Sequence, residues 1–110
     1  MRETKRRRLE AKGWKVGTAG EFLGLSPAEE AYLELRLRLS DAIRKRRLRK
    51  RMTQTRLAKV LGSSQSRVAK MESGDSSVSL DLLVTSLFWL GTTRAELAGI
   101  ISGRRRLPAA

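Results

Sequence analysis

Residues 52–74 contain two short runs in which apolar residues recur at the spacing of an amphipathic helix. Thr53 precedes the first run and Ser64 the second, and both residue types cap helix N-termini well. Gly62 lies between the runs, where a helix can end in the left-handed conformation that glycine adopts readily. The apolar positions of the two runs are Leu57, Ala58, Val60, Leu61, Val68 and Met71. The pattern predicts two helices joined by a tight turn.

The preceding segment shows two competing patterns. Ser26, Pro27 and Glu29 form a strong helix start, because a capping box and a proline at the first helical position occur together. Residues 32–40 nevertheless alternate with period two, which is typical of a strand. Leu, Glu and Arg favour a helix, so we predict one helix from residue 27 to about residues 49–52. Its expected apolar stripe comprises Ala28, Ala31, Leu35, Leu39, Ala42 and Ile43.

Three further helices are predicted at the two ends of the chain. Ser79 caps an apolar helix over residues 80–90, and Thr93 with Glu96 forms a capping box for a last helix ending near Ile101. A short helix closed by Gly24 is expected before the long one. We therefore predict an all-α fold of five or six helices. Its expected parts are a basic arm with a short helix (1–25), a helical domain (26–102) and a basic tail (103–110).

The composition narrows the class of protein. A net charge of +13 in 110 residues favours a polyanionic partner. The chain has no Cys and no His, which removes thiolate metal sites and the commonest general base and metal ligand. We therefore expect no catalytic residues, metal or cofactor, and no enzyme activity. With no apolar run approaching about 20 residues, we expect no membrane association and a cytoplasmic protein.

Polar residues on the outer side of the second predicted helix have the chemistry of base recognition. Gln65 can pair with two atoms of adenine, Ser66 can bond to several base edges, and Arg67 and Lys70 can reach guanine or the backbone. In most basic proteins such a face is simply solvated. The segment Arg44–Arg51 has seven basic residues in eight, a pattern shared by nuclear-localisation and heparin-binding segments, but leading into these helices it favours phosphate contact.

The spacing of residues 42–91 resembles the helix-turn-helix of Cro/repressor-type, or XRE-family, proteins. The matching positions are Thr53-Gln54, Leu57-Ala58, Leu61-Gly62, Ser64, Val68, Glu72-Ser73-Gly74 and Leu90-Gly91. The resemblance implies a sequence-specific DNA-binding regulator. It assigns Gln65, Ser66 and Lys70 to bases and Gln54 to phosphate, and we add Arg67 from its chemistry.

Further phosphate contacts are expected at Thr53, Ser64, Arg44 and Arg51. The family often pairs an Arg before the motif with a Glu that closes the second helix, and Arg47 and Glu72 occupy those positions. The pair is either buried, and then costly to break, or a surface pair of little consequence. The family usually has Gly where this chain has Arg51.

Regulators of this kind usually bind double-stranded operators as dimers, so we expect a homodimer. Phe88 and Trp89 with the last helix form one candidate interface, and Leu33 with Leu37 forms another. Residues 14–26 resemble the N-terminal part of HigA-type antitoxins, which implies a repressor of a type II toxin–antitoxin operon with a RelE-like toxin as partner. A repressor of this kind would be a bacterial protein associated with the nucleoid. The alternatives are a stand-alone or prophage-type repressor and a basic protein that binds nucleic acids without sequence preference.

Overall fold

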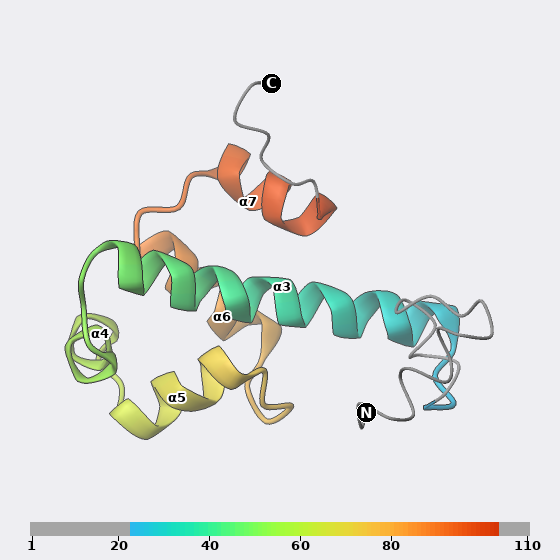
Figure 1. The fold of residues 1–110 in the computed structure, drawn as a ribbon, viewed down its shortest axis with the longest axis horizontal. Coiled ribbons are helices and arrows are strands. Elements are labelled where there is room, and N and C mark those ends of the chain that lie inside the picture. Colours follow the sequence, from blue (N-terminus) through green and yellow to red (C-terminus); the bar gives the residue numbers. More distant parts are fainter. Residues whose placement is uncertain (1–22, 104–110) are drawn as a thin grey trace, which may run out of the picture. The chain divides into compact units, whose positions relative to one another are not determined.

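The computed structural model describes residues 23–103 (Figure 1). These residues form α3 (Pro27–Arg49), α4 (Gln54–Leu61), α5 (Gln65–Ser73), α6 (Leu80–Trp89) and α7 (Arg94–Ser102). Within residues 23–103 there is no strand, and the predicted all-α fold is confirmed. Residues 23–33 and 34–103 belong to separate compact units, and the packing described below concerns residues 34–103. The predicted short helix before Gly24 lies almost wholly outside the described residues.

The long helix α3 begins with the capping box expected from the sequence. The backbone N–H of Ser26 donates to Glu29 Oε1 at 2.8 Å, and the N–H of Glu29 donates to Ser26 Oγ at 3.1 Å. The hydrogen bond from the Ser26 backbone N–H, together with one from the Ser26 side chain, lowers the pKa of the Glu29 carboxyl. The helix continues through residues 32–40 despite their period-two alternation, because the residues are good helix formers and the start signal is strong. Of the predicted stripe, Leu39 and Ile43 are buried, Leu35 and Ala42 are half-buried, and Ala28 and Ala31 are exposed.

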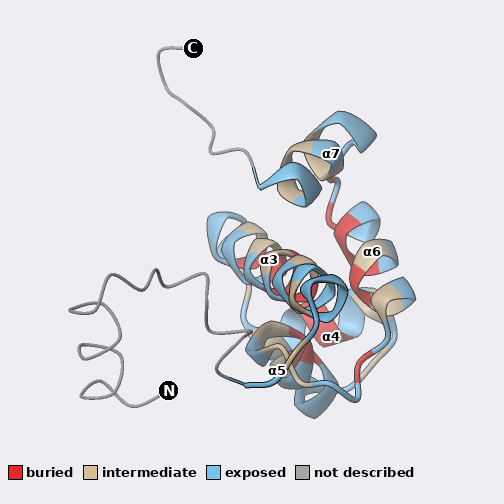
Figure 2. Ribbon diagram, turned by 90° about the vertical axis from the view of Figure 1, so that its right-hand side faces the viewer, coloured by how far each residue is buried: buried red, intermediate tan, exposed pale blue. Residues whose placement is uncertain are grey.

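The core lies where α3, α4, α5 and α6 meet, and buried positions line the facing sides of these helices (Figure 2). Its buried members are Leu39, Ile43, Leu57, Ala58, Val68, Met71, Val78, Leu83, Leu87 and Leu90. Val60 lies outside it, since 40% of its surface is exposed on α4. Phe88 and Trp89 are also exposed, at 42% and 69%, and so are not core residues of the single chain.

The turns that set the angles between helices use left-handed backbone. Gly62 ends α4 with φ 65° and Gly74 ends α5 with φ 78°. Arg51, between α3 and α4, has φ 58° and is the single non-glycine residue with positive φ in the described part of the chain. A side chain in this conformation costs about 1 kcal/mol. The turn expected to need glycine is therefore made without it.

The last helix is attached to the core through Arg46 of α3. Its Nη2 donates to the Gly91 carbonyl at 2.9 Å and its Nε to the Leu90 carbonyl at 3.3 Å, at the end of α6. Its Nη1 lies 3.4 Å from Glu96 Oε1, and Glu96 also closes the capping box with Thr93 that begins α7. Helix α7 lies on the opposite side of α3 from α5 (Figure 1). Arg46 thus stabilises the junction between α6 and α7.

Candidate nucleic-acid interface

Helix α5 has one buried side and one solvent side. Val68 and Met71 are fully buried beneath it. The residues predicted to contact bases, Gln65, Ser66, Arg67 and Lys70, are all exposed. Ser64 caps the helix, since its Oγ accepts from the backbone N–H of Arg67 at 3.2 Å. The first turn of α5 therefore offers hydrogen-bonding side chains to solvent, together with the partial positive charge of a helix N-terminus.

Helix α4 presents a second N-terminus. Thr53 is its cap, and its Oγ1 accepts from the N–H of Arg56 at 3.0 Å. Gln54 follows as the first helical residue and is half-buried. The hydroxyl oxygens of Thr53 and Ser64 are thus both used as capping acceptors, which leaves their O–H hydrogens as donors for a phosphate.

Arg47 and Glu72 form a buried ion pair between α3 and α5. Arg47 Nε lies 2.6 Å from Glu72 Oε2 and Nη2 lies 3.0 Å from Oε1, which is the forked geometry of an arginine–carboxylate pair. The two side chains are 10% and 4% exposed. The third donor, Arg47 Nη1, bonds to the Met52 carbonyl at 2.7 Å and so fixes the turn between α3 and α4. The hydrogen bond to Glu72 raises the pKa of the Arg47 guanidinium.

The ion pair continues outward through two glutamine side chains. Gln54 Nε2 donates to Glu72 Oε1 at 3.1 Å, and Gln65 Nε2 donates to Gln54 Oε1 at 2.7 Å. We call Glu72, Gln54 and Gln65 the amide chain. It joins α4 to the first turn of α5, and reading the sequence did not reveal it. Two Gln residues at helix starts, eleven positions apart on either side of a tight turn, are the signal that could have suggested it.

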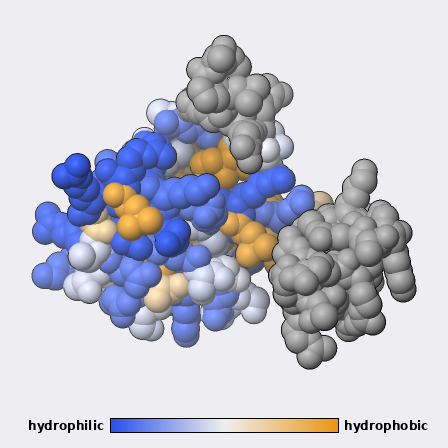
Figure 3. Space-filling model, viewed as in Figure 1, coloured by the Kyte–Doolittle hydropathy of each residue, from blue (hydrophilic) through white to orange (hydrophobic). Residues whose placement is uncertain are grey.

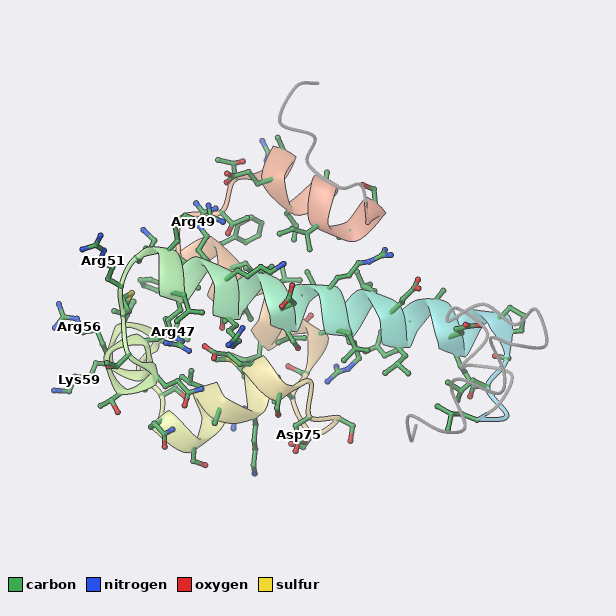
Figure 4. The ribbon with its side chains drawn as sticks, viewed as in Figure 1. Arg47, Arg49, Arg51, Arg56, Lys59 and Asp75 are labelled. Carbon is green, nitrogen blue, oxygen red and sulfur yellow. The ribbon has the colours of Figure 1, made fainter. Side chains whose placement is uncertain are left out.

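Exposed cations surround the end of the molecule formed by α3 and α4. Arg51, Arg56 and Lys59 extend away from the helices at this end (Figure 4), and hydrophilic residues dominate the surface there (Figure 3). The exposed basic residues of the segment and of α4 are Arg44, Lys45, Arg49, Lys50, Arg51, Arg56 and Lys59. Arg44 and Arg51, predicted phosphate contacts, are therefore at the surface. Arg46 and Arg47 of the same run point inward.

The loop after α5 carries the acidic residue Asp75, unlike the cationic surface formed by α3 and α4. Asp75 Oδ1 accepts from the N–H of Ser77 at 2.8 Å, and hydrogen bonds from the side chain and the backbone of Ser77 lower the pKa of the Asp75 carboxyl. Buried Arg36 donates to the Asp75 carbonyl at 2.9 Å. Asp75 is thus held as a carboxylate at the end of α5 that is remote from Gln65. The cationic surface is concentrated at the other end, near α4.

Comparison with known proteins agrees with this geometry. Residues 43–85, somewhat less than half of the chain, match the family model described as Helix-turn-helix. The match identifies residues 43–85 as a helix-turn-helix segment and supports the resemblance to the Cro/repressor, or XRE, type. A segment of this kind supports a DNA-binding transcription regulator as the class of protein. No curated protein and no solved structure matches the chain.

The described residues contain neither a metal-binding cluster nor a membrane-spanning helix. Among residues 23–103, no three His, Cys, Asp or Glu side chains lie close enough together to hold a metal ion. No helix in this range is both long and apolar enough to cross a bilayer.

Proposed function

We propose that the protein is a sequence-specific, dimeric transcriptional repressor that inserts the first turn of α5 into the DNA major groove. The observation that carries this proposal is the position of Gln65, exposed at the start of α5 and bonded to Gln54. A carboxamide there can pair with adenine, while Ser66, Arg67 and Lys70 reach neighbouring bases.

The phosphate backbone supplies the rest of the affinity. The N-termini of α4 and α5 attract phosphate through their dipoles and free N–H groups. Gln54 has a second amide N–H beside the one bonded to Glu72. We assign the phosphate contacts to Thr53, Gln54, Ser64, Arg44 and Arg51, since all five lie at or next to these N-termini or on the cationic surface.

Dimerisation is assigned to the exposed apolar residues at the end of α6 and on α7. Trp89 is 69% exposed, Phe88 42% and Ile101 46%. Residues 75–103 hold three acidic residues and one basic residue in a chain of net charge +13, so two copies can approach there without the repulsion of the cationic surface. Because α7 and α5 lie on opposite sides of α3 (Figure 1), contact through α7 leaves α5 uncovered.

Selection from random duplexes at about 150 mM salt, a physiological ionic strength, tests the recognition. A dimeric repressor enriches an inverted repeat whose half-sites are about 10 base pairs apart. Gln65→Ala should weaken binding to the enriched site and leave binding to random DNA unchanged. Lys45→Ala, which removes an exposed cation paired with Asp41 on α3, is the control and should not alter base preference. Absence of any enriched site would favour binding by charge alone.

Sedimentation tests the dimer interface and separates the two predicted surfaces. Trp89→Ser should yield a monomer, whereas Leu37→Ser, at a residue that is 47% exposed on α3, should leave the dimer intact. The opposite result would assign the interface to α3. A wild-type protein that is monomeric both alone and on its operator would contradict the dimer.

The antitoxin function predicted from residues 14–26 stays a prediction, because most of these residues lie outside the described part of the chain. A RelE-like toxin is a basic protein, so we expect it to bind away from the cationic surface of α3 and α4. Co-purification of such a toxin with the wild type, but not after removal of residues 1–25, would assign the contact to the arm instead. The repressor function does not depend on this outcome.

A further inference from the structure

The amide chain begins at a group that can only accept hydrogen bonds. The Glu72 side chain is 4% exposed, and Arg47 holds both of its oxygens. An ionised carboxylate has no donor, so the partner at Glu72 Oε1 must be the NH₂ end of the Gln54 carboxamide. The buried carboxylate of Glu72 therefore determines the orientation of the Gln54 carboxamide.

The orientation of Gln54 determines that of Gln65. With its nitrogen on Glu72, Gln54 presents its oxygen to α5, and this oxygen accepts from Gln65 Nε2 at 2.7 Å. The nitrogen of Gln65 is thereby directed to Gln54. Gln65 keeps one N–H and its carbonyl oxygen for another partner, and their order along the helix is fixed.

An unrestrained glutamine also offers one donor and one acceptor, but in no fixed order. The terminal torsion of Gln is broad, so a solvent-exposed carboxamide can rotate and exchange its oxygen and nitrogen. A fixed pair of one donor and one acceptor matches the N7 and N6–H₂ groups of adenine. It does not match guanine, which offers two acceptors at the same edge.

We propose that Glu72, held by Arg47, is a positioning residue for base recognition: acting through Gln54, it fixes the orientation of the Gln65 carboxamide and so the preference of Gln65 for adenine. This proposal rests on the proposed function, since it concerns the base contact made by α5. It gives Gln54 a role in specificity in addition to its contact with phosphate.

Two substitutions interrupt the amide chain at different points. Glu72→Gln keeps the size of the side chain but introduces an NH₂ group, so Gln54 can bond in either orientation. Gln54→Met removes both amide bonds and leaves the Arg47–Glu72 pair intact, which keeps the test valid even where Glu72→Gln lowers stability. Lys59→Met is the matched control, because it changes an exposed α4 side chain outside the amide chain.

The experiment measures binding to the selected operator and to three duplexes that differ from it at one base pair. That base pair is the one whose identity ceases to matter in Gln65→Ala. Titrations by fluorescence anisotropy are made below the melting transition of each variant. Both amide-chain variants should lose roughly five- to tenfold in discrimination at that base pair, within the range of a bidentate contact, and keep the other preferences. Lys59→Met should weaken all duplexes equally.

A double-mutant cycle identifies the path of the effect. Glu72→Gln in the Gln54→Met background should cause no further loss of discrimination, because the two residues act in series. An unchanged ratio in both single variants, with equal weakening of every duplex, would overturn this proposal alone and leave the proposed function standing. A wild-type protein that binds all four duplexes equally would overturn both.

Discussion

Removing Arg47 should destabilise the fold more than removing any exposed basic residue. Arg47→Met removes the charged partner of Glu72. The Glu72 side chain is 4% exposed in the wild-type structure and lies at the C-terminal end of α5. The helix dipole is negative at that end, so it opposes the uncompensated charge. The substitution also removes the hydrogen bond to the Met52 carbonyl.

The expected loss is about 3–5 kcal/mol, the usual cost of breaking one side of a buried ion pair. Small domains unfold with a total of about 5–15 kcal/mol, so this is a large fraction of the stability. At about 4–8 °C per kcal/mol for a domain of this size, the melting temperature should fall by more than about 10 °C. Glu72→Leu should cause a loss of similar size.

Urea and thermal denaturation followed by far-UV circular dichroism measure the effect. The matched control is the Lys45–Asp41 pair, whose N–O distance is 2.9 Å but whose side chains are 67% and 53% exposed. Lys45→Met should cost less than about 0.5 kcal/mol. Combining Arg47→Met with Glu72→Leu should restore much of the single-variant loss, because an apolar pair needs no charge compensation. Shifts below one degree in both single variants would refute the reasoning.

Three further results are expected. Arg51→Gly should raise the free energy of unfolding by about 0.5–1 kcal/mol, since φ 58° suits glycine, and should weaken binding to all DNA; lower stability in urea denaturation would contradict this. Arg46→Met should increase hydrogen exchange in α7 and leave α4 and α5 protected, since Arg46 bonds to the α6–α7 junction; equal loss of protection everywhere would be the contrary result. The hydrogen bond from the Thr93 N–H, with a further contribution from Arg46, lowers the pKa of Glu96. The ionised Glu96 therefore stabilises the fold at pH values above its unfolded-state pKa, and this stabilisation is lost as the pH falls through its folded-state pKa. The difference in melting temperature between wild type and Glu96→Gln should therefore shrink on acidification, and a constant difference would count against it.

Local signals in the sequence predicted the helices well. Capping residues such as Ser26, Ser64 and Thr93 mark helix starts in the structure as they do in the sequence, because capping depends on residues only three apart. The alternating segment 32–40 was ambiguous in pattern alone, and helix propensity together with the start signal gave the correct helix. Val60 was wrongly grouped with the apolar positions of α4, since periodicity over eight residues defines a face only loosely.

Contacts between helices were harder to predict. The hydrogen bond of Gln54 to Gln65 depends on the angle between α4 and α5, which the sequence does not state. The inward direction of Arg46 likewise depends on where the end of α6 lies, 44 positions away along the chain. The meeting of Arg47 with Glu72 was anticipated only through the family resemblance. Contacts between residues far apart in the chain could therefore be predicted only where the family resemblance supplied them.

The inward arginines change how the salt dependence of DNA binding should be read. Each phosphate neutralised by a cation releases about 0.9 counterion from duplex DNA, so the slope of affinity against salt counts the cations that reach the backbone. The segment Arg44–Arg51 contains seven basic residues, but Arg46 is bonded to the carbonyls of Leu90 and Gly91, and Arg47 to Glu72. These two cations have already exchanged water for protein partners and release no ions when DNA binds. The segment therefore contributes to counterion release through its exposed members, fewer than its formal charge indicates.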